Sequence, residues 1–590
     1  MTFPIVGIGA SAGGLEAVSE LLAALPSQCG MAFVLVQHLD PAHESLLTEL
    51  LAKKTAMPVV QAREGVAVEP DHVYVIPPNS TLTLGDQHLH LAVRPSAPAR
   101  HMPVDALLKS LAADRGDASI GVILSGGDSD GALGIEAIKH EGGITFAQEP
   151  AQARFPGMPR SAIETGCVDF VLRTREIARE LARLVRHPYL RALPALQPGN
   201  ADSEGSAGAK EEEHLRRVFR RLRAAHGADF THYKRSTLRR RIARRMALQK
   251  IDDAADYVAL IERDPTEAAT LYQDFLIRVT GFFRDPDSFE GLRQRAFPSL
   301  CEGRSAKNPI RIWVPGCATG EEVYSIAMTL VEYLGERHMP EAIQIFGTDL
   351  SETAIEKARA GVYLDNIAQE VSSERLARFF VKQDDRYRIA KSIRDLCIFA
   401  RQDVTRDPPF SRLDLVSCRN LLIYLDSSAQ RRVMQVFHYA LQPQGFLMLG
   451  PSESVGQASD LFDLADKHLR IYTRKPVPPG GSIDLGGRTG APYSRPREAA
   501  EEEAAVLEAD SVQREADRLL LARFAPASLL VDEALNILQF RGETGPYLEH
   551  ASGPPSLNLH RVARPELLVE IAPAIQEARV APRSAGKACA

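Results

Sequence analysis

The sequence predicts a multidomain α/β protein with two parallel, doubly wound sheets, a helical subdomain between them and a small α+β tail. Its 590 residues are enough for several domains rather than one. Near the N-terminus, and again near residue 310, a strand-like apolar run is followed by a glycine-containing turn and then by apolar residues at helical spacing. Each of these segments is typical of the first strand and helix of a parallel sheet. Residues 211–285 lie between them and have helical periodicity.

The composition is that of an ordinary globular protein, with 45% hydrophobic and 25% charged residues. The net charge of −6 does not identify a partner by itself. The seven cysteines are scattered and form no Cys-x-x-Cys pair, which favours free thiols in a reducing compartment and predicts no metal site. No apolar run approaches the roughly 20 residues that a membrane-spanning helix needs, and no signal peptide is recognisable. We therefore expect a cytoplasmic protein.

Residues 1–187 are predicted to form the first α/β domain. Its opening strand, Pro4–Gly9, leads through a turn of small residues into a helix at Leu15–Leu25. A second parallel strand is expected at Ala32–Gln37 and a later buried strand at Ile120–Leu124. Polar residues follow all three strands at their carboxyl ends, where open α/β sheets build their sites. Shorter strands are expected at Val73–Ile76 and Leu89–Val93.

Three of these polar residues are the parts of a nucleophilic triad. Ser11 follows the first strand, His38 ends the second and Asp130 lies in the loop after the later strand. In a triad, Ser11 attacks a carbonyl carbon, His38 takes and returns the proton, and Asp130 fixes the imidazole. Backbone amides of the glycine turns are candidates to stabilise the oxyanion. In the alternative interpretation Ser11 caps a helix, His38 forms a strand-end hydrogen bond and Asp130 belongs to a turn.

Four sequence blocks carry a resemblance to a known family. They read GIGASAGGLEA, VQHLDP, LSGGDSDGALG and FPGMPRSAIETGCVD, and they occur in this order within residues 4–185. They resemble the catalytic domain of the chemotaxis protein-glutamate methylesterase CheB. The resemblance implies that Ser11, His38 and Asp130 are the triad, and that the reaction is hydrolysis of glutamate methyl esters on receptors, with glutamine deamidation as a side activity. Ala12 replaces a usual Thr, and Gly127 replaces a frequent Met whose amide helps form the oxyanion hole.

Residues 188–210 are predicted to be a linker, and residues 211–285 a helical subdomain with a basic segment. Lys210 to Lys250 contains 14 Lys or Arg residues against 4 Asp or Glu residues. Leu238, Ile242 and Met246 recur at helical spacing, so one face is expected to pack while the rest is cationic. A solvated helix face, docking to an acidic protein surface and nucleic-acid binding remain open. Nucleic acid is the least favoured because no aromatic stacking platform or base-reading motif accompanies the charge.

Residues 286–475 are predicted to form the second α/β domain, of Rossmann-like type. A strand at Ile310–Val314 is followed by a turn, a helix at Val323–Leu334, and a second strand that ends on Asp349. A carboxylate at this position can hold the two hydroxyls of a ribose. The turn lacks a G-x-G-x-x-G sequence and carries the acidic Glu321, so it suits a ligand with a ribose and a positive charge but no phosphate. S-adenosyl-L-methionine is such a ligand, and an ordinary strand-helix-strand crossover is the alternative.

A second resemblance covers residues 214–475. The blocks IRVTGFFRD, VPGCATGEEVYSIAM, FGTDLSETAIEKARAGVY and VSCRNLLIYLD resemble the chemotaxis receptor glutamate O-methyltransferase CheR. The resemblance implies a basic receptor-facing helix, a methyltransferase sheet, and an antiparallel subdomain inserted at Val362–Ala400. It implies that Thr280 and Arg284 contact the methionine end of the cofactor, that Glu321 meets its amino group and that Asp349 meets its ribose. Further cofactor contacts are implied for Asp403 and Val404 at the adenine and for Arg419 and Asn420 beside the reacting centre.

The C-terminal part is expected to contain a flexible linker at 476–500, a charged helix at 501–523 and a small tail at 524–590. Residues Ser528–Gly542 resemble the first hairpin of a PAS-like sensor module, and a degenerate or truncated regulatory tail is the preferred interpretation.

Together these features predict a bifunctional enzyme that methylates and demethylates glutamates of methyl-accepting chemoreceptors or similar coiled-coil proteins. It would reach the membrane only through those receptors. Two alternatives are a signalling scaffold in which one catalytic domain only binds its ligand, and methylation of nucleic acid through the basic helical segment. The first is disfavoured by the intact sets of site residues, and the second predicts strongly salt-dependent binding.

Overall fold

The structure is a computed structural model that describes residues 3–38, 46–94, 101–191, 206–276, 280–305, 308–335 and 342–476, with separate positions between 528 and 573. The chain forms two compact units, Met1–Leu485 and Gly486–Ala590. Among the described helices, none is long and apolar enough to cross a membrane.

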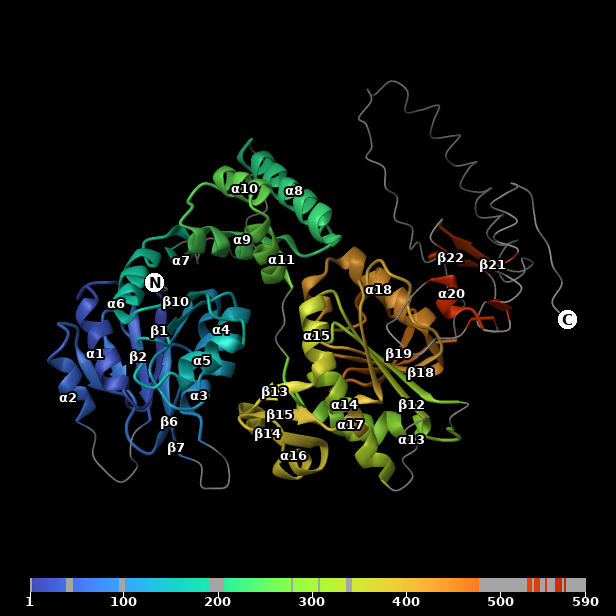
Figure 1. The fold of residues 1–590 in the computed structure, drawn as a ribbon, viewed down its shortest axis with the longest axis horizontal. Coiled ribbons are helices and arrows are strands. Elements are labelled where there is room, and N and C mark those ends of the chain that lie inside the picture. Colours follow the sequence, from blue (N-terminus) through green and yellow to red (C-terminus); the bar gives the residue numbers. More distant parts are fainter. Residues whose placement is uncertain are drawn as a thin grey trace. The chain divides into compact units, whose positions relative to one another are not determined.

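The N-terminal domain is built on a seven-stranded sheet in the order β10-β9-β8-β1-β2-β5-β3 (Figure 1). All of its pairings are parallel. Its strands are β1 (Ile5–Ala10), β2 (Ala32–Gln37), β3 (Val59–Gln61), β5 (Val73–Val75), β8 (Ser119–Ile123), β9 (Ile144–Gln148) and β10 (Phe170–Leu172). The predicted doubly wound sheet is confirmed.

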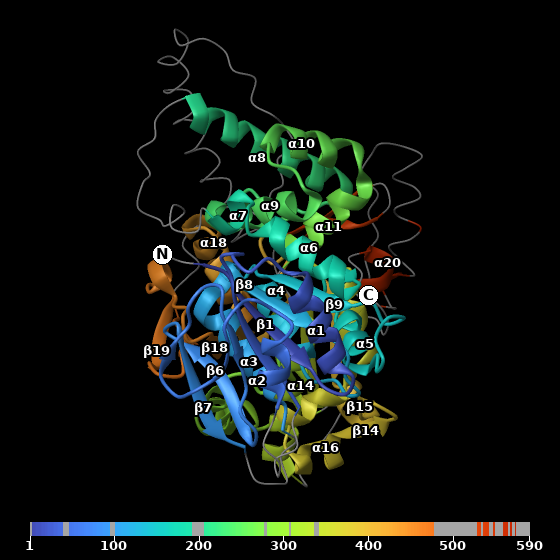
Figure 2. The same ribbon diagram turned by 90° about the vertical axis from the view of Figure 1, so that its left-hand side faces the viewer.

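Helices cover both faces of this sheet, which is why its central strands are continuous apolar runs. One core contains residues of α1 and α6, and the other contains residues of α3, α4 and α5. The helices are α1 (Gly14–Ala24), α2 (Leu47–Ala52), α3 (Pro103–Arg115), α4 (Ala132–His140), α5 (Gly157–Glu164) and α6 (Thr174–Leu184). A separate antiparallel sheet of β4 (Val66–Ala67), β6 (Ser80–Gly85) and β7 (His88–Val93) extends beside α3 (Figure 2).

The start of the predicted linker at 188–210 is helical. Helix α7 (Pro188–Arg191) places Tyr189 and Leu190 in the same apolar core as Ala247 and Leu248. Removal of this apolar surface from water stabilises the helix. Helix α8 (Ser206–His226) begins before the predicted end of the linker, and 192–205 lie outside the described residues.

The helical subdomain consists of α8 together with α9 (Arg235–Gln249), α10 (Ala254–Arg263) and α11 (Pro265–Phe275), which share one apolar core. The carboxylates of Asp253 and Asp264 accept hydrogen bonds from backbone amides at the starts of α10 and α11.

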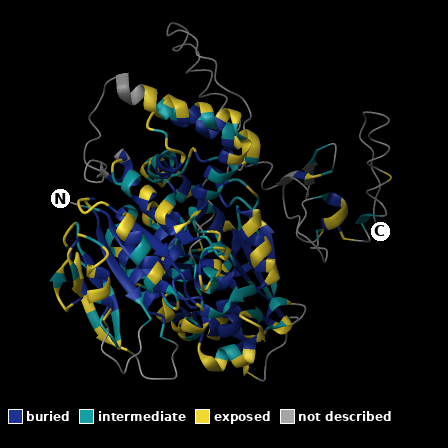
Figure 3. Ribbon diagram, turned by 60° about the vertical axis from the view of Figure 1, so that its left-hand side comes forward, coloured by how far each residue is buried: buried dark blue, intermediate teal, exposed yellow. Residues whose placement is uncertain are grey.

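The second α/β domain has a seven-stranded sheet in the order β16-β12-β11-β17-β18-β20-β19, with β20 antiparallel to both neighbours. Its strands are β11 (Ile310–Pro315), β12 (Ile343–Asp349), β16 (Cys397–Arg401), β17 (Leu413–Cys418), β18 (Leu441–Leu449), β19 (Phe462–Asp466) and β20 (Ile471–Arg474). Its helices include α12 (Pro286–Gly291), α13 (Phe297–Leu300), α14 (Glu321–Leu334), α15 (Glu352–Ala360) and α18 (Ser427–Ala440). The central strands of both sheets are buried (Figure 3), and the predicted Rossmann-like arrangement is confirmed.

The expected insertion at Val362–Ala400 forms a three-stranded antiparallel sheet in the order β13-β15-β14. It contains β13 (Val362–Leu364), a 3-10 turn η5 (Asp365–Gln369), α16 (Ser373–Phe379), β14 (Phe380–Gln383), β15 (Arg386–Ile389) and α17 (Lys391–Arg394). Its predicted end is too late, because Cys397–Arg401 is strand β16 of the main sheet.

The second unit contains a described hairpin of β21 (Ser528–Val531) and β22 (Ile537–Arg541) and a short helix α20 (Leu559–Val562). The hairpin agrees with the expected strands, but a PAS-like module is not confirmed. The predicted helix at 501–523, and the predicted linker beyond residue 476, lie outside the described residues.

Candidate active sites

The three residues predicted as a triad meet at the carboxyl edge of the N-terminal sheet. Ser11 Oγ lies 3.3 Å from His38 Nδ1, and His38 Nε2 lies 2.8 Å from Asp130 Oδ2. Ser11 directly follows β1 and His38 directly follows β2, so the parallel pairing of these strands brings the two side chains together. This hydrogen-bonded order is the one that a serine nucleophile, a base and an orienting carboxylate require.

The carboxylate of Asp130 is fully buried and held by the start of α3. The backbone amide of Val104 donates to Oδ2 at 3.0 Å, and the amide of Asp105 donates to Oδ1 at 2.9 Å. These two donors fix the orientation of the carboxylate toward the imidazole of His38. No pattern in the sequence indicated these amide contacts.

The environment of His38 keeps the imidazole basic. Burial lowers the pKa of His38, but the hydrogen bond and charge of Asp130, with the charge of Asp128, raise the pKa above its usual value of 6.5 overall. Asp128 lies 3.5 Å from His38 Nδ1 and is a site residue that the sequence analysis did not single out, although it stands in the same loop as Asp130.

The glycine turns pack closely around the serine. The amide of Ser11 donates to the carbonyl of Ser125, which precedes the Gly126–Gly127 turn. A Cβ atom on Gly126 would lie 2.0 Å from Met158 Sδ and 3.0 Å from Ser11 Cβ, so only glycine fits against the serine here. The amide of Gly126 already donates to the carbonyl of Phe155 at 2.9 Å, so the amide of Gly127 is the candidate oxyanion donor of this turn.

A second site is a cavity at the carboxyl ends of β11, β12, β16 and β17, which we call the transferase cavity. Its lining residues are His140, Tyr233, Phe275, Leu276, Thr280, Arg284, Gly316, Cys317, Ala318, Glu322, Asp349, Leu350, Gln402, Asp403, Val404, Arg419, Asn420, Leu421 and Tyr424. Seven of the eight residues predicted to bind the cofactor are among them: Thr280, Arg284, Asp349, Asp403, Val404, Arg419 and Asn420.

The floor of the cavity is a turn in unusual backbone conformations. Gly316 has a φ of 69°, and Ala318 has a φ of 46°, which costs energy for a residue with a side chain. The amide of Ala318 donates to Asp349 Oδ2 at 3.0 Å, so the turn is tied to the end of the second strand. Asn420, another lining residue, also has a positive φ, 59°. Such conformations concentrate at functional sites.

Arg419 is the ionic centre of one wall, and its side chain is fully buried. It donates to Asp285 Oδ2 at 2.6 Å and to the carbonyl of Arg284 at 2.8 Å, and its Nη1 lies 3.4 Å from Glu322 Oε2. Arg419 therefore fixes the positions of Arg284 and Glu322. Sequence reasoning expected Arg419 beside the reacting centre but did not reveal these partners.

The structure does not place Glu321 among the residues that line the cavity. Its carboxylate accepts hydrogen bonds from the hydroxyl of Thr319, and burial raises its pKa to about 7. The next residue, Glu322, lines the cavity instead and accepts a hydrogen bond from Ser417 Oγ at 2.6 Å. Because α14 starts at Glu321, the two adjacent side chains point about 100° apart around the helix.

The donor set of the cavity fits S-adenosyl-L-methionine. Two carboxylates, Asp349 and Glu322, suit a ribose and a cationic amino group, and Leu350 and Val404 give an apolar wall for a purine. Oδ1 of Asp403 accepts hydrogen bonds from the amide and the hydroxyl of Thr405, so this side chain shapes the turn that contains Val404. No group of side chains that could hold a metal ion occurs among the described residues.

Two tyrosines of the cavity were not predicted as site residues. Tyr233 precedes α9, and Tyr424 lies in the block VSCRNLLIYLD after β17. The hydroxyl of Tyr424 lies 3.0 Å from Nε2 of His140, which belongs to the N-terminal domain. A contact across 284 residues of sequence has no local signal that could have revealed it.

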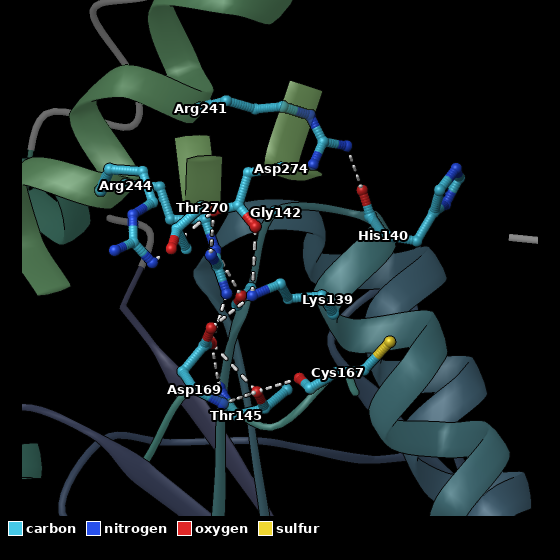
Figure 4. Close-up of polar contacts among 12 residues, drawn as sticks. Lys139, His140, Gly142, Thr145, Cys167, Asp169, Arg241, Arg244, Thr270 and Asp274 are labelled. Atoms are coloured by element: carbon cyan, nitrogen blue, oxygen red, sulfur yellow. Dashed lines mark hydrogen bonds and ion pairs between the residues drawn. The ribbon is translucent and has the colours of Figure 1, made fainter. Parts of the chain in front are cut away.

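The basic helix α9 differs from its prediction. Arg241, Arg244 and Arg245 are buried instead of forming a solvated or receptor-facing surface. Arg244 forms an ion pair with Asp169 of the N-terminal domain (Figure 4). Of the three interpretations left open by the sequence, docking to an acidic protein surface describes this contact, and the surface belongs to the same chain.

Comparisons with protein families match the segments of the chain that contain the two sites. Residues 6–181 match the model of the CheB methylesterase family. Residues 213–276 match the all-alpha domain of CheR methyltransferase, and residues 278–471 match its SAM binding domain. The cofactor of this part is therefore S-adenosyl-L-methionine, as predicted.

Individual relatives cover one or both parts. An uncharacterized 104.1 kDa protein of Rhodobacter capsulatus is 36% identical over 88% of this chain, and the chain spans 56% of that relative's length. A chemotaxis protein methyltransferase of Listeria monocytogenes is 30% identical over 42% of this chain and 92% of its own length. A Leptospira interrogans protein with the provisional name protein-glutamate methylesterase/protein-glutamine glutaminase is 35% identical over 31% of this chain and 96% of its own length.

The Ser11, His38 and Asp130 geometry lies within the first matched segment, and the transferase cavity is built mainly from the other two. The chain therefore belongs to both the CheB methylesterase and the CheR methyltransferase families, which it joins in one polypeptide.

Proposed function

We propose that this chain methylates glutamate side chains of receptor proteins with its CheR part and hydrolyses the resulting methyl esters with its CheB part. The observation that carries the proposal is the presence of both sites in one chain, each with its hydrogen-bonded residues in place. The substrates would be methyl-accepting chemoreceptors or similar coiled-coil signalling proteins, in line with the names of the relatives. Deamidation of receptor glutamines is the expected side activity of the CheB part.

In ester hydrolysis, Ser11 Oγ attacks the ester carbonyl while His38 Nδ1 accepts its proton. The buried carboxylate of Asp130, 2.8 Å from His38 Nε2, stabilises the imidazolium that forms. The amide of Gly127 is proposed to stabilise the oxyanion. His38 then returns the proton to the departing methoxide, and methanol leaves an acyl group on Ser11. Water, with His38 again as the base, attacks this acyl group and releases the glutamate.

In methyl transfer, the acceptor glutamate is already ionised, so the protein mainly aligns and partly desolvates its carboxylate. S-adenosyl-L-methionine supplies the methyl group when it is bound. We infer that Glu322, rather than Glu321, meets its cationic amino group, because only Glu322 lines the transferase cavity. Asp349 is proposed to hold the ribose, and Thr280 and Arg284, which also line the cavity, to contact the methionine end of the cofactor.

The first test is methyl transfer from labelled S-adenosyl-L-methionine to receptor-containing membranes, followed by alkaline treatment. Label released as methanol identifies carboxyl methyl esters. The Ser11→Ala protein should accumulate more label than the wild type, because ester hydrolysis is removed while transfer is retained. The Ser19→Ala protein, altered at a serine of α1 outside the triad, is the control. Binding of the cofactor without any transfer would refute the methyltransferase proposal and favour a sensor or scaffold.

A further inference from the structure

The two catalytic parts share a buried group of charged residues, which we call the interdomain ion cluster: Lys139, Asp169, Arg244 and Asp274. Lys139 Nζ lies 2.5 Å from Asp169 Oδ1 and 3.4 Å from Asp274 Oδ1. Arg244 pairs with Asp169 and lies 3.3 Å from Asp274 Oδ2. Figure 4 shows the side chains of Lys139 and Arg244 converging on Asp169. Lys139 and Asp169 come from the CheB part, whereas Arg244 and Asp274 come from the CheR helical subdomain.

The cluster contains two positive and two negative side chains, and all of them except Lys139 are almost fully buried. The side chains of Asp169 and Arg244 are 1% exposed, and that of Asp274 is 7% exposed. Although burial alone would raise it, the charges of Lys139, Arg244 and neighbouring arginines lower the pKa of Asp274 to about 2. Removal of one charge leaves its partners buried and uncompensated, which disfavours the docked arrangement strongly.

The same contact reaches the transferase cavity. Helix α4 of the CheB part ends at His140, whose carbonyl accepts a hydrogen bond from Arg241 of α9 at 3.1 Å. His140 also lines the cavity, and its Nε2 lies 3.0 Å from the hydroxyl of Tyr424. An acceptor side chain that approaches Tyr424 from this side must displace the end of α4.

A second contact joins the CheR insertion to the edge of the triad. Ser129, which precedes the catalytic Asp130, donates to Asp365 at 2.7 Å. Gln369 donates to Asp105 at 3.1 Å, and Asp105 in turn holds Asp130 through its amide. The docked arrangement thus places CheR residues beside the esterase site as well as CheB residues in the wall of the transferase cavity.

We propose that the CheB part competes with an acidic substrate surface for binding to α9. Its docking restrains methyl transfer until a substrate displaces it. This inference rests on the proposed function for the identity of that substrate. A protein surface that presents ionised glutamates carries the same charge as Asp169, so it can pair with Arg241 and Arg244 once α4 has moved away. Tyr233, just before α9, lines the cavity, so a partner bound along α9 would lie next to the reacting centre.

The docking would also determine when each of the two opposed activities operates. A surface with ionised glutamates competes well with Asp169 and opens the transferase cavity. Methylation removes one negative charge per glutamate, so the product competes less well and the CheB part can dock again. The restraint therefore weakens where methyl acceptors are abundant.

The decisive experiment compares the full-length wild type with the Asp169→Asn and Lys139→Gln proteins. Both substitutions leave the arginines of α9 intact and unbalance the cluster from the CheB side. The control is Asp395→Asn, which removes the same charge from an exposed pair with Lys391 inside the CheR part.

Docking is measured by phenylglyoxal labelling of Arg241 and Arg244 with peptide mass analysis. Competition is measured by binding of a synthetic helical peptide that carries glutamates along one face, and activity by methyl transfer to receptor-containing membranes. Hydrolysis of a small soluble ester shows that the CheB part is folded.

We expect Arg241 and Arg244 to be protected in the wild type and in the control, and labelled in both cluster variants. The variants should bind the acidic peptide about tenfold more tightly than the wild type, because a competing state is removed. They should also methylate receptors faster while hydrolysing the small ester at the wild-type rate. If Arg244 stays protected in folded cluster variants, the cluster does not hold the CheB part against α9. If Arg241 and Arg244 are labelled but the affinity for the acidic peptide is unchanged, the CheB part does not compete with acidic surfaces for α9. If neither the wild type nor the variants methylate receptors, the proposed function is wrong. The arginine labelling and the peptide binding still test the docking proposal in that case.

Discussion

At the level of single residues, both sites depend on charges held in fixed positions. The basicity of His38 comes from Asp130 and Asp128, which outweigh the effect of burial. The ionic wall of the transferase cavity comes from Arg419, whose partners include Glu322. Each arrangement predicts a measurable effect of substituting one side chain.

The pH dependence of ester hydrolysis should report the pKa of His38. The base must be neutral, and its pKa in the folded protein is raised above 6.5, so kcat/KM should fall as the pH decreases through a value above 6.5. The Asp130→Asn protein loses the group that raises the pKa. Its activity should drop by about 10⁴-fold, as for a misoriented triad histidine. The pH at which the remaining kcat/KM falls should be lower than in the wild type. An unchanged profile in that variant would contradict the assigned role of Asp130.

Glu322 and Glu321 are adjacent and chemically identical, so they form a matched pair for testing cofactor binding. Glu322→Gln should weaken the affinity for S-adenosyl-L-methionine by about 10- to 100-fold, because a charged hydrogen bond is lost in the cavity. Glu321→Gln should leave the affinity almost unchanged, since this side chain bonds to Thr319 outside the lining. Isothermal titration calorimetry measures both. A larger loss in Glu321→Gln would return the role to Glu321, as the family resemblance implied.

At the level of helices, strands and turns, the sites depend on the turns that connect a strand to a helix. The turn after β8 packs against Ser11 and against the start of α5 (Gly157–Glu164). A Cβ atom on Gly157 would lie 2.5 Å from the carbonyl oxygen of Gly127, so it can be accommodated only by moving the turn. The same atom on Gly127 would meet open space.

Gly157→Ala should therefore slow ester hydrolysis while Gly127→Ala does not. If the turn supplies an oxyanion donor, its displacement should lower kcat by about 10²-fold, with a smaller effect on KM. Steady-state hydrolysis of a small ester measures the two proteins side by side, and circular dichroism checks that both are folded. Equal activity of Gly157→Ala and the wild type would remove the turn from the proposed oxyanion hole.

At the level of the entire chain, the interdomain ion cluster should couple the unfolding of the two catalytic parts. Loss of one buried partner typically costs about 3–5 kcal/mol, so Asp169→Asn should largely abolish the docking. Differential scanning calorimetry should then separate a transition of the CheB part from one of the CheR part, whereas the wild type and Asp395→Asn unfold with overlapping transitions. Identical traces for all three proteins would show that the cluster does not couple the parts.

The amino-acid sequence was sufficient to predict the two sheets, the positions of Ser11, His38 and Asp130, and the carboxylate Asp349. Ser11 and His38 directly follow apolar strands, Asp130 lies in the loop after another, and Asp349 ends a fourth. Parallel pairing brings the carboxyl ends of such strands to one edge of a sheet without further information. The linker and insertion boundaries were less accurate, because short segments such as Pro188–Arg191 and Cys397–Arg401 are ordered by tertiary packing rather than by their own pattern.

Only the folded structure showed that Glu322, and not Glu321, lines the cavity. Adjacent side chains on a helix point in different directions, and these directions depend on where the helix begins, which is Glu321 in α14. The surroundings of the basic helix α9 also became visible only in the folded structure. A run of arginines has the same sequence pattern whether it faces solvent, a receptor or another domain. The pairing of Arg244 with Asp169 spans 75 residues, and charge attraction over that separation acts only after both parts have folded.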